Sequence, residues 1–221
     1  MSELMDKICL CIERGKVDKK APYPPDMMNQ DGADEYAREA IKAGESPDNI
    51  LAACNTAMER IGDKFSRNEV FVPELLMAAR AMNGVMEHLK PFFQAGNIKT
   101  KGTFVLGTVA GDLHDIGKNL VSMVVEGNGW KVVDLGVDVK TDKFLKAIEE
   151  HPGCAVGLSA LLTTTMANMA ATVKRIKELH ADTVVIVGGA PLSHKAAKEM
   201  GADGYAANPQ ETVRILNSLV G

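Results

Sequence analysis

The sequence predicts two regions of different fold: a four-helix bundle over residues 1–95 and an α/β domain with a five-stranded parallel sheet over residues 96–221. Apolar residues of the first region recur at the spacing of amphipathic helices. In the second region, short β-branched runs alternate with helical patterns, which is typical of repeated βα units. A polar, glycine-containing segment from Gln94 to Lys101 lies between the two regions, and we interpret it as a linker.

Start and stop signals define the helices of the first region. Gly15 and Gly44 follow two short apolar-periodic runs and are expected to end them. Ser46 followed by Pro47 predicts an N-cap and a first helical residue, and Pro73 begins another helix. The helices are expected over residues 2–14, 33–43, from 46 to about 65, and from 73 to about 90.

A proline-rich segment interrupts the first region. Three of the four residues from Pro22 to Pro25 are proline. Because proline lacks a backbone N–H and cannot continue a helix, we expect a loop or an insertion over residues 20–32, without a helix.

The second region is expected to hold five strands, each followed by a helix. The strands are expected over residues 103–109, 131–135, 155–158, 183–187 and 204–206, and the helices over 117–126, 141–150, 166–180, 193–200 and 209–219. Because parallel strands need crossover helices on the faces of the sheet, we expect an order close to the flavodoxin-like, Rossmann-type arrangement. The carboxyl ends of the strands then share one edge, where open α/β sheets bind ligands.

The composition excludes some classes of function. The 221 residues carry a formal net charge of -4, without the basic footprint of proteins that bind nucleic acid or anionic membranes. No apolar run approaches the length of about 20 residues that spans a bilayer, and the N-terminus lacks a signal peptide's apolar core. The four cysteines are scattered, which favours reduced thiols and a cytoplasmic location. We expect proteins and small molecules as partners, and neither nucleic acid nor a membrane.

The most informative motif is the turn from Gly111 to Gly117, which follows the first predicted strand. It places the carboxylate of Asp112 and the imidazole of His114 at the carboxyl end of that strand. Asp112 can accept a hydrogen bond from one ring nitrogen while the other nitrogen faces a metal. The alternative is a polar turn in which Asp112 or Asp115 caps the next helix.

Two further loops are expected on the same edge of the sheet. One follows the third strand and carries hydroxyl groups over residues 157–165, and the other carries two adjacent glycines over residues 187–191. The edge therefore combines an imidazole, a carboxylate, hydroxyls and backbone without side chains. The nearby lysines, Lys118 and Lys195, do not stand in a P-loop pattern, so a phosphate site is disfavoured.

Three dispersed elements on this edge share their spacing with a known family. They are Asp112-x-His114-x-x-Gly117, Ser159-x-Leu161 and Gly188-Gly189, separated by 41 residues (118–158) and 26 residues (162–187). The set resembles the signature of the cobalamin-binding module of methionine synthase and of the corrinoid proteins of anaerobic methyltransferase systems. The segment from Ile61 to Met82 is similar to the helical cap domain that precedes that module, so the resemblance covers nearly the whole chain.

The resemblance implies roles for the residues around the first loop. His114 would be the lower axial ligand of cobalt, displacing the cofactor's own base, and Asp112 would orient it and adjust its basicity. Thr165 stands where methionine synthase has a serine that extends this relay, and it keeps the hydroxyl. Gly117 completes the cofactor-binding motif.

The same resemblance implies a slot for the displaced nucleotide tail of the cofactor. Gly188 and Gly189 would let the tail pass close to the sheet, because a Cβ there would clash with it. The slot is expected to be lined by Ser159, Leu161 and Thr163, with Ala190 and the loop Ala206–Pro209 as weaker candidates.

The helical region would cover the upper face of the corrin, as the cap domain of the family does. Candidate cap residues are Phe71, Met77 and Met82. For each of them, an ordinary place in the bundle core is the favoured interpretation.

The function implied is that of a methyl carrier whose cofactor is cobalamin, in its methylcobalamin form during turnover. A substrate:corrinoid methyltransferase would load the cobalt from a methylamine, methanol, a betaine or a methoxylated aromatic. A methylcorrinoid:acceptor methyltransferase would pass the methyl group to a thiol or tetrahydrofolate, and a reductive activase would be a further partner. The chain would thus be a subunit with a reactive prosthetic group rather than a stand-alone enzyme.

Three other functions remain open from the sequence. The chain could be the cobalamin-binding subunit of an adenosylcobalamin mutase or a cobalamin-dependent regulator. It could also be a flavodoxin-like signalling module in which Asp112 accepts a phosphoryl group, although that interpretation leaves the spacing of His114 and of the paired glycines unexplained.

Overall fold

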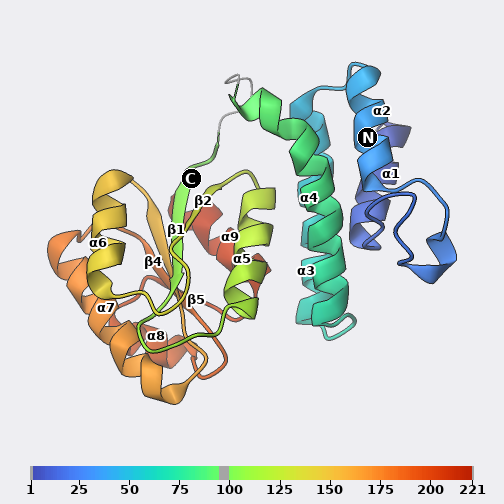
Figure 1. Cartoon of the computed structure of the whole chain (residues 1–221). Coiled ribbons are helices and arrows are strands. Elements are labelled where there is room, and N and C mark those ends of the chain that lie inside the picture. Colours follow the sequence, from blue (N-terminus) through green and yellow to red (C-terminus); the bar gives the residue numbers. More distant parts are fainter. Residues whose placement is uncertain (1, 95–99, 221) are drawn as a thin grey trace. The chain divides into compact units, whose positions relative to one another are not determined.

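The computed structural model describes residues 2–94 and 100–220 (Figure 1). The chain divides into two compact units, one of Met1–Thr100 with Gly127–Gly129 and the other of the remaining residues. The linker expected between Gln94 and Lys101 and the domain boundary expected after residue 95 fall on residues 95–99, outside the described residues. No helix within the described residues is both long enough and apolar enough to cross a membrane.

The first unit is a bundle of helices, as predicted. The helices are α1 (Glu3–Glu13), α2 (Ala33–Lys42), α3 (Pro47–Ser66) and α4 (Val72–Gln94). The side chain of Ser46 caps α3 as expected, because its Oγ accepts a hydrogen bond from the backbone N of Asn49 at 3.2 Å. Apolar side chains from the helices, among them Ile8, Ile50 and Met58, are fully buried in its core.

Two details of the bundle differ from the sequence-based expectation. Helix α4 continues through Pro91 to Gln94, whereas we expected it to end near Lys90. Pro91 lacks the N–H that would donate to the carbonyl of Glu87, so α4 passes it with the loss of one helical hydrogen bond. The segment 20–32 contains one short 3-10 helix, η1 (Pro25–Met27), so the expectation of no helix there is wrong. A single 3-10 turn needs few backbone hydrogen bonds, which makes it compatible with prolines at its start.

The second unit is an α/β domain whose described strands form a five-stranded parallel sheet in the order β2-β1-β3-β4-β5. The strands are β1 (Thr103–Thr108), β2 (Lys131–Asp134), β3 (Ala155–Ser159), β4 (Val185–Gly188) and β5 (Gly204–Ala206). This is the flavodoxin-like order that the alternation of strands and helices predicted. Strand β4 begins two residues later than expected, because the backbone N of Thr183 donates to the carbonyl of His180 in a turn.

Helices cover both faces of this sheet, with α6 and α7 on one side and α5 and α9 on the other (Figure 1). The helical elements of the unit are α5 (Ile116–Gly127), α6 (Thr141–Glu150), the 3-10 helix η2 (Thr163–Thr165), α7 (Met166–Leu179), α8 (His194–Met200) and α9 (Pro209–Leu219). Each of these helices follows a strand, so the first turns of α5, α7 and α9 lie near the carboxyl edge of the sheet.

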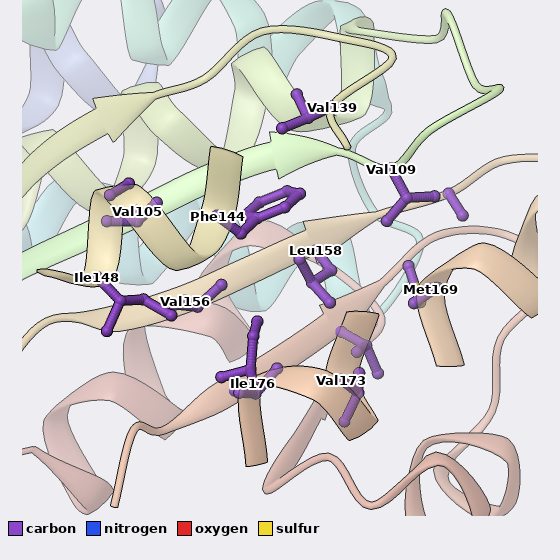
Figure 2. Close-up of a cluster of buried hydrophobic side chains, with 14 of the residues drawn as sticks. Val105, Val109, Val139, Phe144, Ile148, Val156, Leu158, Met169, Val173 and Ile176 are labelled. Carbon is purple, nitrogen blue, oxygen red and sulfur yellow. The ribbon is translucent and has the colours of Figure 1, made fainter. Parts of the chain in front are cut away.

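Buried apolar side chains fix the sheet against α6 and α7. Figure 2 shows Phe144 and Ile148 of α6 and Val173 of α7 gathered over the strands. Val156 and Leu158 of β3 lie in the same cluster, and both are almost completely buried. Dense packing of this kind holds strand ends rigidly, so the loops at the carboxyl edge start from fixed positions.

Candidate functional site

The loop that carries Asp112 and His114 leaves β1 and enters α5. The hydroxyl of Thr108, the last residue of β1, donates to the carbonyl of His114 at 2.9 Å. The backbone N of Asp112 donates to the carbonyl of Val109 at 3.1 Å, which closes a turn directly after the strand. The loop is therefore anchored at its start and at His114, and it presents the imidazole outward from the sheet edge.

Asp112 and His114 form a directly bonded pair. Nδ1 of His114 lies 2.7 Å from Oδ1 of Asp112, and the backbone N of His114 donates to the same oxygen at 3.1 Å. The two side chains differ in exposure, since that of His114 is 50% exposed and that of Asp112 is 0% exposed. The pair thus joins a buried carboxylate to an imidazole that a ligand can reach.

The second carboxylate oxygen of Asp112 is held by the loop that follows β3. The backbone N of Leu161 donates to Oδ2 at 2.7 Å, the backbone N of Leu162 at 3.3 Å, and the hydroxyl of Thr165 at 2.8 Å. Burial by itself raises the pKa of Asp112, but the hydrogen bonds from Leu161, His114 and Thr165 outweigh it and hold the pKa well below its usual range. Asp112 is therefore an ionised, fully engaged acceptor.

This ionised acceptor determines the tautomer of His114. A carboxylate can only accept hydrogen bonds, so Nδ1 of His114 must carry the proton that lies between the two residues. Nε2 then keeps its lone pair and can bind a metal ion. The arrangement matches the common pattern in which a carboxylate orients a metal-binding histidine.

The geometry fits neither of the alternative roles, which were capping of α5 by a carboxylate of this loop and acceptance of a phosphoryl group by Asp112. The side chain of Asp112 bonds to His114 and to the 161–165 loop rather than capping α5. The carboxylate of Asp115 accepts from the side-chain amide of Asn119 at 3.1 Å. Because Asp112 is 0% exposed and both of its oxygens are engaged, it does not present a nucleophile to a phosphoryl donor.

Thr165 is brought to the relay position that the sequence suggested. It lies at the end of η2, directly before α7, and is buried. Its Oγ1 lies 2.8 Å from Oδ2 of Asp112 and 2.9 Å from the carbonyl oxygen of Leu162. A hydroxyl has one proton, so Thr165 can donate its hydrogen bond either to Asp112 or to the carbonyl of Leu162.

The remaining predicted residues lie at the ends of β3 and β4. Ser159 ends β3 and is partly exposed, while Leu161 and Thr163 are exposed on the loop that follows. Gly188 ends β4, and Gly189 and Ala190 follow it at the same edge. The carboxyl edge of the sheet therefore carries all of them, although no side-chain hydrogen bond of the described residues joins Ser159 or Thr163 to the Asp112–His114 pair.

Gly189 is required by the chain itself. Its φ is +134°, and a Cβ there would lie 1.8 Å from the carbonyl oxygen of Ala160. At Gly188 a Cβ would lie 3.1 Å from the carbonyl oxygen of Ala206, which is a tight but smaller conflict. We expected these glycines to make room for a ligand, and the structure adds a backbone reason for Gly189.

Gly117 is different, because the packing of the chain does not require it. It lies in the first turn of α5, is exposed, and a Cβ there would meet no described atom within 4 Å. Glycine in a helix costs about 1 kcal/mol relative to alanine. Gly117, three residues after His114 in the sequence, is thus a glycine that the packing of the described chain does not explain, and its Cβ position is open.

The exposed apolar side chains at the edge that carries His114 were not predicted, apart from Leu161. Large apolar side chains are exposed on this edge of the sheet: Leu113 (73%), Ile116 (68%), Leu161 (44%), Leu162 (42%) and Val137 (37%). Such a group of exposed apolar residues marks a binding surface rather than an ordinary solvated loop. Leucine and isoleucine at the variable positions of the 111–117 turn, which is otherwise polar, were the signal available in the sequence.

Gln210 was also missed. It lies in the first turn of α9, directly after β5, and is 4% exposed. Its Oε1 is buried without a hydrogen-bond partner among the described residues. A buried acceptor without a donor is costly unless something else satisfies it, so Gln210 is a candidate acceptor for a bound ligand at this edge.

Comparison with protein families identifies both regions of the chain. A family model described as a B12 binding domain matches residues 102–214, and a second one of the same description matches residues 27–90. The trimethylamine corrinoid protein of Methanosarcina barkeri is 38% identical over 186 residues, which is 82% of this chain and 86% of the relative. A corrinoid protein of Desulfitobacterium hafniense (strain Y51) is 36% identical over 179 residues, 79% of this chain and 83% of the relative.

Solved structures show the same architecture. A cobalamin-binding protein from Desulfitobacterium hafniense DCB-2 matches with a TM-score of 0.78 and 28% identity, covering 98% of each chain. The methanol:cobalamin methyltransferase complex of Methanosarcina barkeri contains a chain that matches with a TM-score of 0.77 and 28% identity, covering 99% of this chain and 80% of that one. A helical cap domain joined to a Rossmann-like domain is thus shared with cobalamin-binding proteins.

Proposed function

Because this chain belongs to the family of B12-binding corrinoid proteins, we propose that it carries a methyl group on the cobalt of its cofactor between two methyltransferases. The chain binds cobalamin, and its relatives are corrinoid proteins of methyltransferase systems. The observation that supports the proposal most directly is the half-exposed His114, whose Nδ1 is engaged by buried Asp112 and whose Nε2 is thereby left as a ligand.

The residues at the carboxyl edge of the sheet fit a corrinoid. Nε2 of His114 would be the cobalt ligand that the protein supplies, and exposed Leu113 and Ile116 would contact the apolar parts of the macrocycle. The open space at Gly117 admits a bulky group next to the imidazole. The nucleotide tail would be held at the carboxyl ends of β3 and β4 by Ser159, Leu161, Thr163, Gly188, Gly189 and Ala190. When bound, the corrinoid supplies a cobalt centre that accepts a methyl group and gives it up.

The chain's own residues would tune that centre. Asp112 holds the proton on Nδ1 of His114, which makes Nε2 a better electron donor. Thr165 donates to Oδ2 of Asp112 at 2.8 Å or turns to Leu162, so it can strengthen or weaken the negative charge that Nδ1 faces. Shifts of this kind adjust how firmly the imidazole ligates as the demand of the metal changes.

We infer that the methyl donor is a methylamine. Relatives named as trimethylamine, dimethylamine and monomethylamine corrinoid proteins are 36–38% identical to this chain. Among the solved structures, the monomethylamine corrinoid protein of Methanosarcina barkeri is 32% identical to this chain, and the matching chain of the methanol:cobalamin methyltransferase complex is 28% identical. A donor-specific methyltransferase would be the first partner, and a second methyltransferase and a reductive activase would complete the system in the cytoplasm.

A label-transfer experiment tests the proposal. The corrinoid-loaded chain is reduced and mixed with a methylamine methyltransferase and isotopically labelled trimethylamine, dimethylamine, monomethylamine or methanol. We expect label on the protein-bound cofactor from a methylamine. If label is transferred only from methanol by a methanol methyltransferase, the methylamine donor is contradicted and the carrier role is still supported. A loaded chain that accepts label from no donor would overturn the carrier role itself.

A further inference from the structure

We propose that Asp138 is a positioning residue that holds the Asp112–His114 loop in its ligating arrangement, an inference that rests on the proposed function of that loop. Asp138 lies between β2 and α6, 26 positions after Asp112, and no motif connects the two residues. It is exposed and makes its bonds to backbone atoms, so it acts through the loop rather than on the cofactor.

Two hydrogen bonds of opposite direction join Asp138 to the loop. Its backbone N donates to the carbonyl of Asp112 at 3.0 Å. Its Oδ1 accepts from the backbone N of Gly111 at 2.7 Å. Asp138 is thus bonded to the peptide group that precedes Gly111 and to the peptide group that follows Asp112, and these two bonds restrict the direction in which the Asp112 side chain leaves the backbone.

The backbone of Asp138 is held in an unusual conformation. Its φ is +51°, in the left-handed region that residues other than glycine adopt rarely and that aspartate and asparagine tolerate best. Its neighbours fix it there, since Gly136 accepts from the backbone N of Thr108 at 3.0 Å and Val139 donates to the carbonyl of Thr108 at 2.9 Å. Conformations of this kind persist where the surrounding structure imposes them, and they concentrate at functional sites.

Asp112 is therefore held by two different loops. The loop after β3 bonds its carboxylate through Leu161 and Thr165, and the loop after β2 bonds its backbone through Asp138. The hydrogen bond from the backbone N of Gly111 to the Asp138 carboxylate is solvent-exposed. If the Asp138 carboxylate is removed, water can replace it at the N of Gly111, so the fold survives while the loop becomes less well ordered.

Two substitutions separate the carboxylate from the backbone conformation. D138G keeps the left-handed backbone and the bond to the Asp112 carbonyl, and removes only the acceptor for Gly111. D138N keeps an oxygen acceptor and also tolerates a positive φ. The matched control is N29G, because Asn29 has a similar φ of +62° in the first unit.

Two measurements would not change if Asp138 only stabilised the fold. The first is the ¹⁵N signature of the His114 ring in the apoprotein, which reports whether Nδ1 alone carries the proton. The second is the affinity for hydroxocobalamin, with the absorption spectrum of the loaded protein. We expect D138G to lose the single tautomer and to bind about 3- to 10-fold more weakly, the range that one hydrogen bond supports. D138N and N29G should match the wild type.

Three outcomes would overturn the proposal. One is a D138G protein with wild-type ring signals and affinity. Another is a D138N protein as impaired as D138G, which would mean that the acceptor oxygen is not what matters. The third is a D138G protein that fails to fold, since Asp138 would then hold the domain rather than the loop. Failure of the wild type to bind hydroxocobalamin would contradict the proposed function, whereas the ring signals of the apoproteins would still decide the role of Asp138.

Discussion

Thr165 and His114 bond to opposite oxygens of one buried carboxylate: Oγ1 of Thr165 lies 2.8 Å from Oδ2 of Asp112, and Nδ1 of His114 lies 2.7 Å from Oδ1. A change at Thr165 therefore reaches the imidazole through a single ion. We expect T165V to raise the pKa of Asp112, because Oδ2 loses a donor, and to destabilise the apoprotein by about 2 kcal/mol. Denaturant unfolding measures the loss of stability, and the affinity for hydroxocobalamin measures what the weakened carboxylate does to ligation by His114.

Two control variants accompany T165V: one keeps a hydroxyl at position 165, and the other removes a neighbouring hydroxyl. T165S keeps the donor and should stay close to the wild type in both measurements, while T164V removes an exposed hydroxyl of the same 3-10 turn that makes no hydrogen bond to Asp112. Equal losses in T165V and T164V, or no loss in T165V, would show that the hydroxyl of Thr165 does not support the carboxylate.

Asp112 should make stability depend on pH in a defined direction. Its pKa in the folded protein lies below the value of about 3.9 for an unfolded aspartate, so the unfolded chain binds its proton first as pH falls. The stabilisation by this group is therefore complete above about pH 5 and is lost progressively below about pH 4. The free energy of unfolding of the wild type and of D112N should differ most at neutral pH and converge in acid. A difference that is constant from pH 7 to pH 3 would contradict the ionised, hydrogen-bonded state.

The two glycines Gly117 and Gly189 should respond oppositely to alanine. G117A places a methyl group in open space on a helix, so the apoprotein should be up to about 1 kcal/mol more stable. The same methyl group should weaken cofactor binding, because it occupies the space beside His114. G189A should destabilise the apoprotein by about 3 kcal/mol, since its Cβ would overlap the carbonyl of Ala160. If G117A binds cobalamin as tightly as the wild type, Gly117 does not make room for the cofactor.

The cysteines of the bundle should be unreactive in the native protein. Burial raises the pKa of Cys11 to about 11 and that of Cys54 to about 12, so both thiols stay protonated at physiological pH. A thiol-specific reagent at pH 8 should label them only as fast as the bundle opens, and denaturant should accelerate the reaction strongly. Rapid labelling of Cys54 in the folded protein would contradict its complete burial.

The fold could be predicted from the sequence because its signals are local. The alternation of β-branched and helical runs predicted the parallel sheet, and Ser46 before Pro47 predicted the capped start of α3, both of which the structure confirms. The predicted end of α4 near Lys90 was wrong, because a helix can pass a proline with the loss of one hydrogen bond, and α4 passes Pro91 and ends at Gln94.

The site was predicted only where a motif marked it. Asp112 and His114 stand two positions apart, so their pairing is visible in the sequence. Leu161 and Asp138 bond to the Asp112 loop from loops that are far away in the chain. The composition of those loops does not predict these hydrogen bonds. The backbone conflict at Gly189 depends on Ala160 in a neighbouring loop and was likewise not predictable. The assignment of individual residues to the cofactor stays a prediction.

The absorption spectrum of the chain loaded with hydroxocobalamin tests the central claim most directly, measured beside H114A and H151A. His151 follows the end of α6, away from the carboxyl edge of the sheet, and serves as the matched control. We expect stoichiometric binding and a histidine-ligated spectrum for the wild type and H151A, with that spectrum lost or shifted in H114A. A spectrum that H114A shares with the wild type would show that His114 is not the ligand of cobalt.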